Sequence, residues 1–303
     1  MPDKPNTAFA LPDHRVLALE GPDAARFAHA QFMSDVAGLG DGHWQWSGWL
    51  TPKGRVVALF ALLRFDAQRL WLLLPDADPE ALAAQLRRFV FRSKLAISPR
   101  PDLVASGVFA PLAADAAAAT PGRSAIAMRG TDAVELDFGG DGGARTLRIA
   151  PAAAGNGTGD DVAGITGTAA WRAFDLAHGL PRLDAAQADR WTPQQLSLDR
   201  LRAYSVKKGC YPGQEIVART HFLGQAKRGL RLLVAPGPVA AGAGLSDAAG
   251  ASAGEVACAA PLADGRSFLI QVVAPLDSPA EAFVLHGQPT SPRPFEGGLA
   301  RPA

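Results

Sequence analysis

The chain has 303 residues, of which 48% are hydrophobic and 19% are charged, and its formal net charge is +1. This length predicts two or three domains, and this composition is typical of an ordinary globular protein. A net charge near zero creates no global field that would attract nucleic acid or a membrane. The chain also lacks a long unbroken apolar run, which excludes a membrane-spanning helix.

Only two cysteines are present, Cys210 and Cys258. So few cysteines argue against a disulfide framework and indicate a reducing compartment. The first residues, MPDKPNTAFALPDHR, lack the continuous apolar segment of a secretory signal. We therefore expect a cytoplasmic protein without a membrane partner.

The first third of the chain has clear strand and helix patterns. Residues 14–21 predict a strand, and Gly-Pro-Asp at 21–23 is typical of a helix start. Pro-Lys-Gly at 52–54 separates two apolar runs and indicates a hairpin, and residues 69–75 predict a buried strand. From Asp78 the apolar spacing predicts an amphipathic helix that ends near Leu95.

The rest of the chain is less regular. Residues 112–164 are rich in Gly and Ala and predict loops between short strands, and residues 171–184 predict a helix closed by Gly179. After Arg228, short apolar runs broken by Gly and Pro predict a small β-barrel or sandwich. The tail at 286–303 has four prolines and is expected to be mobile.

The stretch KKGCYPGQEIVART, residues 207–220, is the most distinctive motif. Tyr211-Pro212-Gly213-Gln214 predicts a type II turn, because Pro suits its second position and Gly its third. Cys210 immediately precedes this turn. It is either a structural thiol or a reactive one, and a nearby Lys207 or Lys208 ammonium would favour the thiolate.

Two further features allow two interpretations each. Residues 199–231 hold eight Lys or Arg against two Asp or Glu, a local charge of +6, which suits an anionic ligand or a solvated face. Trp44, Trp46 and Trp49 recur near strand spacing, as half-buried packing or as a platform for a planar ring. Cys258 is interpreted as a small core residue. Two isolated cysteines cannot form a zinc site by spacing, so no metal is expected.

The motif resembles the signature of the YgfZ family, which comprises folate-binding, iron–sulfur-associated relatives of the glycine-cleavage T-protein. LALEGPDAARFAHAQFMSDV, TPKGRVVALF, RRFVFRSKL and TPQQLSLDRL resemble further segments of the family, so the resemblance covers residues 15–110 and 170–285. The signature residues are matched here by Lys208, Gly209, Cys210, Tyr211, Pro212, Gly213, Gln214, Glu215, Ala218 and Arg219.

The resemblance implies an α+β fold with T-protein-like mixed α/β folate-binding domains and a small C-terminal β-barrel. We assign residues 1–225 to the folate-binding region, with two subdomains, residues 226–285 to the barrel and residues 286–303 to the tail. The implied ligand is tetrahydrofolate or a related folate. The implied role is assembly or repair of iron–sulfur clusters in client enzymes, including enzymes that thiolate tRNA.

The site residues follow from the same resemblance. Cys210 is the expected reactive thiol, Lys208 its expected activator, and Gly209 and Gly213 shape the backbone. Glu215 and Arg219 lie on one side if their segment is a strand. The residues expected to contact folate are, in the motif, Tyr211, Gln214, Glu215 and Arg219. Outside the motif, Trp44 and Trp46 are expected to form an aromatic wall on which the pterin stacks, and Arg202 belongs to the basic stretch that would attract the glutamate tail.

Two alternatives remain at this stage. The first is a tetrahydrofolate-dependent aminomethyl transferase, but the Asn-Ala stretch of T-proteins is replaced here by Leu74-Pro75-Asp76. The second is an RNA-binding module based on residues 199–231, which shows no common RNA-binding signature. We expect iron–sulfur client proteins or assembly factors as partners, no direct nucleic-acid contact and no classical enzymatic turnover.

Overall fold

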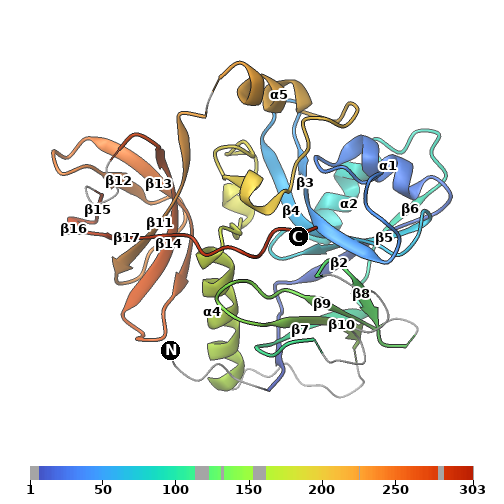
Figure 1. Ribbon diagram of the computed structural model, residues 1–303, viewed down its shortest axis with the longest axis horizontal. Helices are drawn as coiled ribbons and strands as arrows, with labels where there is room; N and C mark the ends of the chain where they lie inside the picture. Colours follow the sequence, from blue (N-terminus) through green and yellow to red (C-terminus); the bar gives the residue numbers. More distant parts are fainter. Residues whose placement is uncertain are drawn as a thin grey trace.

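The structure is a computed structural model that describes residues 7–112, 123–130, 133–152, 162–224, 226–278 and 283–302. Three antiparallel sheets surround the long helix α4 (Val162–Ala177), with the C-terminal sheet on one side and the two N-terminal sheets on the other (Figure 1). The part of the chain assigned to loops, residues 112–164, lies partly outside the described residues.

The first sheet has the order β3-β4-β5-β2-β6. Its strands are β2 (Arg15–Glu20), β3 (His43–Leu50), β4 (Val56–Arg64), β5 (Arg69–Leu74) and β6 (Ala96–Pro99). Helices α1 (Ala24–Gln31) and α2 (Pro79–Arg87) cover one face, where their apolar side chains form one core cluster with the sheet. The predicted strand at 14–21, the hairpin at 52–54 and the strand at 69–75 are confirmed.

The second sheet has the order β1-β7-β10-β9-β8 and packs against the other face of the first. Its strands are β1 (Phe9–Ala10), β7 (Leu103–Val108), β8 (Ile126–Met128), β9 (Val134–Asp137) and β10 (Thr146–Pro151). Helix α4 lies close to this sheet, because Gly107 leaves room for the Trp171 ring, which a Cβ at Gly107 would meet at 2.8 Å. The predicted end of this helix at Gly179 is confirmed, since Gly179 has φ +76°.

The C-terminal sheet is a seven-stranded antiparallel, barrel-like structure with the order β16-β15-β12-β13-β14-β11-β17. Its strands are β11 (Arg228–Pro236), β12 (Gly244–Ser246), β13 (Ser252–Pro261), β14 (Ser267–Pro275), β15 (Val284–Leu285), β16 (Gln288–Pro289) and β17 (Ser291–Arg293). A small C-terminal β-barrel, predicted from the short apolar runs, is therefore confirmed.

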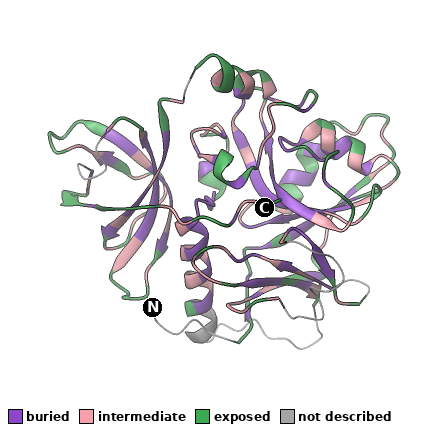
Figure 2. Ribbon diagram, in the orientation of Figure 1, coloured by how far each residue is buried: buried purple, intermediate pink, exposed green. Residues whose placement is uncertain are grey.

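The expectation of a mobile tail at 286–303 is wrong for its described residues. β16 and β17 belong to the barrel-like sheet, and the chain then crosses to the two N-terminal sheets (Figures 1 and 2). There Leu299 is buried and its carbonyl accepts a hydrogen bond from Trp46 Nε1 at 2.8 Å. Arg301 is fully buried and donates to the carbonyls of Arg123, Asp137 and Gly139. Proline content alone missed these anchors.

Predictions for two helical segments also differ from the structure. Helix α2 starts as expected, with the Asp78 carboxylate accepting from Ala81 N at 2.8 Å, but it ends at Arg87 rather than near Leu95. Beyond Arg87 the backbone forms only tighter i→i+3 bonds, from Phe89 N to Leu86 O and from Val90 N to Arg87 O, and Phe91 at φ +36° then turns the chain away from a helical path. The segment with Glu215 is helix α5 (Gln214–Phe222), not a strand.

Candidate functional site

The motif contains the type II turn that the sequence predicts at residues 211–214. Gln214 N donates to Tyr211 O at 3.1 Å, and Gly213 has φ +79° and ψ 0°. A Cβ at Gly213 would also meet Thr51 O at 2.6 Å and Gly54 Cα at 2.7 Å. Glycine is therefore required at position 213 for both its backbone conformation and its contact with the β3–β4 hairpin.

Helix α5 is held by the tip of the β3–β4 hairpin and by the segment that precedes the motif. A Cβ at Gly54, in the Pro-Lys-Gly turn, would meet the Ile216 side chain of α5 at 2.8 Å. Gln194 Nε2 donates to Val217 O at 2.8 Å from the preceding segment. Two motifs that are about 160 residues apart in sequence thus form one close contact.

Lys208 holds the other end of the motif against α1. Its Nζ donates to the carbonyls of His29, Phe32 (2.5 Å) and Ser34 (3.0 Å), which lie at and beyond the end of that helix. A cation at a helix C-terminus stabilises the unpaired carbonyls there. Burial lowers the pKa of Lys208 to about 8, while the Asp35 carboxylate acts in the opposite direction. Among the described residues, this ammonium donates only to carbonyls of α1 and of the residues that follow it.

Tyr211 and Gln214 close the loop from inside. The buried Tyr211 donates its hydroxyl to Ser205 O at 3.0 Å, and its ring lies 4.9 Å from Lys208 Nζ. Gln214 Nε2 donates to Lys208 O at 3.0 Å. Both residues, expected to contact folate, donate instead to backbone carbonyls at Ser205 and Lys208.

Cys210 lies at the outside of this closed loop. Its side chain is exposed and is not part of a disulfide. The neighbouring Gly209 is exposed, and a Cβ there would meet nothing within 4 Å. The loop therefore presents the thiol beside open space.

Cys258 has the opposite environment. It is fully buried in β13, where Sγ donates to Gln271 Oε1 and accepts from Arg182 N, both at 3.4 Å. Burial raises the pKa of this thiol to about 12. The interpretation of Cys258 as a core residue agrees with this placement.

Glu215 and Arg219 share one face of α5, because they are four residues apart on a helix. Both are exposed, and Glu215 lies in the first turn, where the helix dipole favours an acid. The structure therefore brings them together, for a different geometric reason from the strand that was expected.

The expected aromatic wall is wrong as a surface. Trp44 and Trp46 are 0% and 1% exposed, and both pack against Phe138 with ring centroids 4.8 and 5.3 Å away. Arg301 lies over Trp44, and Leu299 O accepts from Trp46. The C-terminal tail thus covers these two rings, and stacking of another ring on either of them would require the tail to leave.

The basic stretch at 199–231 does not form one surface. Arg202, expected to contact folate, donates to Pro302 O at 3.1 Å, and Arg200 lies 4.7 Å from the Phe295 ring. Arg231 donates to carbonyls at 275–278, at the end of β14 and just beyond it. With Lys208 buried on α1, half of the eight cations serve internal contacts, and the local charge of +6 overstates the attraction for an anion.

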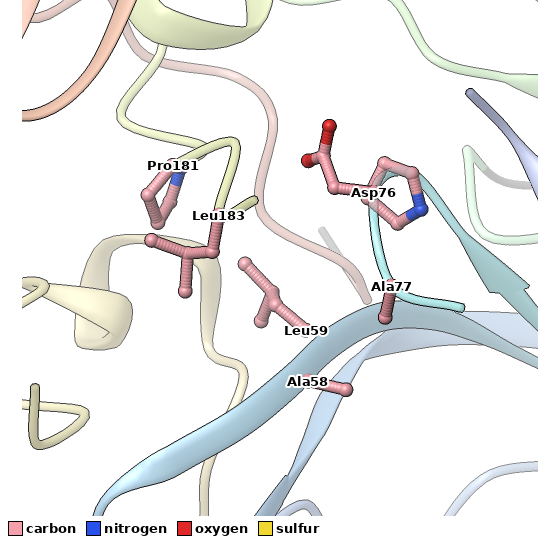
Figure 3. Close-up of a pocket in the computed structure, with 7 residues that line it drawn as sticks. Ala58, Leu59, Asp76, Ala77, Pro181 and Leu183 are labelled. Carbon is pink, nitrogen blue, oxygen red and sulfur yellow. The ribbon is translucent and has the colours of Figure 1, made fainter. Parts of the chain in front are cut away.

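A small cavity lies between β4, the residues that follow β5 and the segment that follows α4 (Figure 3). Pro181 and Leu183 face Leu59 of β4 and Ala77 across it. Its volume is about 10 Å³, roughly the room for one water molecule. We call this the central cavity; its lining is Ala58, Leu59, Pro75, Asp76, Ala77, Pro181 and Leu183.

The acid of the central cavity is already engaged. Asp76 accepts from Arg182 Nε at 2.8 Å and Arg182 Nη2 at 3.0 Å, and Arg172 Nη1 lies 3.3 Å away. Arg182 also donates to Asp175 at 3.1 Å, and Asp175 accepts from Arg145 at 2.5 Å. These charges form one network that joins the first sheet, α4 and the segment after it.

His14 lies beside this network in a closely packed region. It is 5% exposed, and its Nδ1 has no hydrogen-bond partner within the described part of the chain. Burial and the charges of Arg182, Arg145 and Arg172 hold the pKa of His14 well below its ordinary value. The imidazole is therefore neutral. The residues around His14 in this region are Trp46, Ala61, Leu73, Pro75, Phe138 and Leu180.

Sequence reasoning did not select His14, Arg182 or the carboxylate of Asp76 as site residues. Arg182 follows the Gly-Leu-Pro that ends α4, and Asp76 follows the β5 strand, so both lie just after predicted elements. A charged residue directly after a predicted element was the only sign in the sequence that Arg182 or Asp76 could belong to a site. A single sequence does not show that the end of α4 and the end of β5 lie side by side.

None of the described helices is long and apolar enough to cross a membrane. Among the residues described, no three His, Cys, Asp or Glu side chains gather in a way that could hold a metal ion.

No protein-family model matches the chain. The chain is 31% identical over 238 residues to a tRNA-modifying protein YgfZ from Klebsiella pneumoniae, covering 75% of this chain and 71% of that protein. The chain belongs to the YgfZ family. A YgfZ protein from Cronobacter sakazakii is 29% identical over 241 residues, covering 77% of this chain and 72% of the relative.

A solved structure extends the YgfZ comparison to nearly the whole fold. The glycine cleavage system aminomethyltransferase T from Bartonella henselae matches with a TM-score of 0.72, covering 95% of this chain and 85% of that protein. The sequence identity is 19%, so this match shows the fold alone. The predicted T-protein-like mixed α/β fold is confirmed.

Proposed function

We propose that this protein assists the assembly or repair of iron–sulfur clusters in client enzymes through the thiol of Cys210. The exposed position of Cys210 is the observation that carries the proposal. Its loop is fixed by Gly213 against the hairpin and by Lys208 against α1, so the thiol is presented by a rigid support. A partner protein can approach an exposed thiol, whereas a substrate pocket would enclose it.

The name of the relatives suits an indirect role in tRNA modification. Both YgfZ relatives are called tRNA-modifying proteins. In our proposal the clients include cluster-containing enzymes that thiolate tRNA, and the partners are these clients or cluster assembly factors. Both cysteines are free, which suits the reducing cytoplasm in which we place the protein.

We further propose that a reduced folate binds at an opened form of the central cavity. The residues fit in kind, because Asp76 provides a polar group among apolar walls, and opening the cavity beyond the shared Pro75 would reach the unpartnered Nδ1 of His14. The volume of the cavity is too small for a folate. Pockets for such ligands have a volume of roughly 300 Å³ or more, and the volume of this cavity is about 10 Å³. Binding would therefore require residues 180–183 to separate from β4.

No observation favours the aminomethyl transferase in the same way. That chemistry needs an acid free to act near the folate, and Asp76 has both oxygens bonded to Arg182. We therefore expect no classical turnover from this site.

The thiol role is tested by complementation of cells that lack their own YgfZ protein. The unmodified chain is expected to restore the activity of iron–sulfur enzymes and the thiolated nucleosides of tRNA. Cys210→Ser should restore neither, although it accumulates to the same level and melts at the same temperature. The matched control, Cys258→Ala, should restore both to the extent that it folds. Full rescue by Cys210→Ser would show that the thiol has no role in this function.

A further inference from the structure

The turn after α2 has an unusual residue at its corner. Ser93 N donates to Val90 O at 2.7 Å, so Phe91 and Arg92 are the two central residues of a tight turn. Phe91 has φ +36°. In such turns the first central position with positive φ favours glycine, and a bulky side chain there strains the backbone. The chain nevertheless places phenylalanine at this corner.

The Phe91 ring contributes little to the fold. It is 88% exposed, more than any other large hydrophobic side chain among the described residues. The turn is anchored by its neighbours instead, because Val90 and Leu95 pack against the core under α2. Phe89 is 38% exposed and sets the edge of its ring against Trp49 at 5.9 Å. A strained residue with an exposed ring points to a role outside folding.

Exposed cations are concentrated in the sequence on both sides of Phe91. Between Gln85 and Ser98 there are four cations and no acid, namely Arg87, Arg88, Arg92 and Lys94. Arg87 donates to Ile97 O, at 2.6 and 3.1 Å, but the other three form no ion pair or side-chain hydrogen bond within the residues described. The nearby Asp23 accepts from Lys94 N and is paired with Arg26, so it does not neutralise the three side chains.

We propose that residues 87–94 bind an unpaired segment of nucleic acid, with one base stacked on Phe91 and phosphates beside Arg88, Arg92 and Lys94. An exposed ring flanked by cations provides both contacts that single-stranded nucleic acids use. A protein partner would require a larger apolar area than two rings provide. A membrane surface would require the broad apolar face of an amphipathic helix or a lipid chain, and this turn exposes only the Phe91 ring and part of the Phe89 ring. The proposal is independent of the folate and thiol proposals and goes beyond them.

Binding is tested with a fluorescently labelled, unstructured RNA oligonucleotide and a DNA oligonucleotide of the same sequence, by anisotropy at several salt concentrations. Phe91→Gly should bind roughly tenfold more weakly and melt at the same temperature as the unmodified protein or higher, because glycine suits this backbone. Phe91→Leu should also bind weakly, since it keeps the apolar volume but loses the ring face. Phe91→Trp should bind at least as well as the unmodified protein.

The charges are tested with the double variant Arg88→Gln/Arg92→Gln. It should lower the slope of log affinity against log salt by roughly 1.4, the value for two phosphate contacts on a single strand. The matched control is Arg266→Gln/Arg293→Gln, which removes two exposed cations from the barrel and should change nothing. Equal affinity for the two oligonucleotides would support a site that accepts either RNA or DNA. Higher affinity for the RNA oligonucleotide would identify the ligand as RNA.

Several results would overturn the proposal. One is no binding of either oligonucleotide at low salt. Another is unchanged affinity of Phe91→Gly or Phe91→Leu, or an equal loss in the barrel control. A third is binding of the turn to anionic phospholipid vesicles with no competition from RNA, which would make this surface a membrane contact.

Discussion

Lys208 and Cys210 are two residues apart, yet their environments differ completely. The Lys208 ammonium is buried and bonded to three carbonyls around the end of α1. The Cys210 side chain is exposed on the far side of the same loop. We interpret Lys208 as a positioning residue that fixes the loop and Cys210 as the group that the loop presents.

The contrast between the two thiols gives a direct prediction. A maleimide reagent near neutral pH should modify one thiol per folded chain and two after unfolding, because burial raises the pKa of Cys258 to about 12 and closes access to it. Cys210→Ser should leave no reactive thiol in the folded protein. Mass spectrometry of the labelled peptides checks the assignment, and fast labelling of Cys258 in the folded chain would contradict it.

His14 predicts how stability depends on pH. Because its pKa is held well below the ordinary value, the unfolded state binds more protons than the folded state as pH falls below about 6.5. The free energy of unfolding should fall there by up to about 1.4 kcal/mol per pH unit from this residue. Urea denaturation between neutral and mildly acidic pH measures the slope.

The variant His14→Gln should show a smaller acid loss than the unmodified protein, and His221→Gln, which removes an exposed histidine on α5, should not. An identical slope for the unmodified chain and His14→Gln would mean that His14 is protonated in the folded state or exposed to solvent.

At the scale of elements, the C-terminal tail connects the barrel to the N-terminal sheets. Arg301→Met should lower the free energy of unfolding by about 2–4 kcal/mol, because it leaves the carbonyls around the guanidinium without their donor. Arg293→Gln, an exposed substitution earlier in the same segment, should change it by less than about 0.5 kcal/mol. Urea denaturation compares the two, and an Arg301→Met variant as stable as the unmodified chain would mean that the tail is not anchored.

The same tail illustrates what the sequence can and cannot predict. Local signals predicted the type II turn at 211–214, the hairpin at 52–54 and the start of α2, because each depends on a few adjacent residues. The burial of Arg301 and of the Trp44 ring depends on segments far apart in the chain, which no local pattern encodes. For this reason the aromatic wall and the mobile tail were predicted incorrectly together.

At the scale of the whole molecule, Cys210 and the central cavity belong to different parts of the fold. Cys210 lies on an outer loop supported by α1 and the hairpin, and the central cavity lies between β4 and residues 180–183. The resemblance predicted the fold and the motif, but the acid and arginine network around Asp76 emerges only when α4 and the first sheet meet. Folate and thiol should accordingly be separable by mutation.

Calorimetric titration with tetrahydrofolate tests this separation most directly, using the unmodified protein, Cys210→Ala and a cavity-filling variant, Ala77→Trp. The matched control is Ala84→Trp, which places the same ring on the exposed face of α2. We predict micromolar binding by the unmodified protein, Cys210→Ala and Ala84→Trp, and none by Ala77→Trp. Absence of binding in all four, or equal binding by Ala77→Trp, would contradict a folate site at the central cavity.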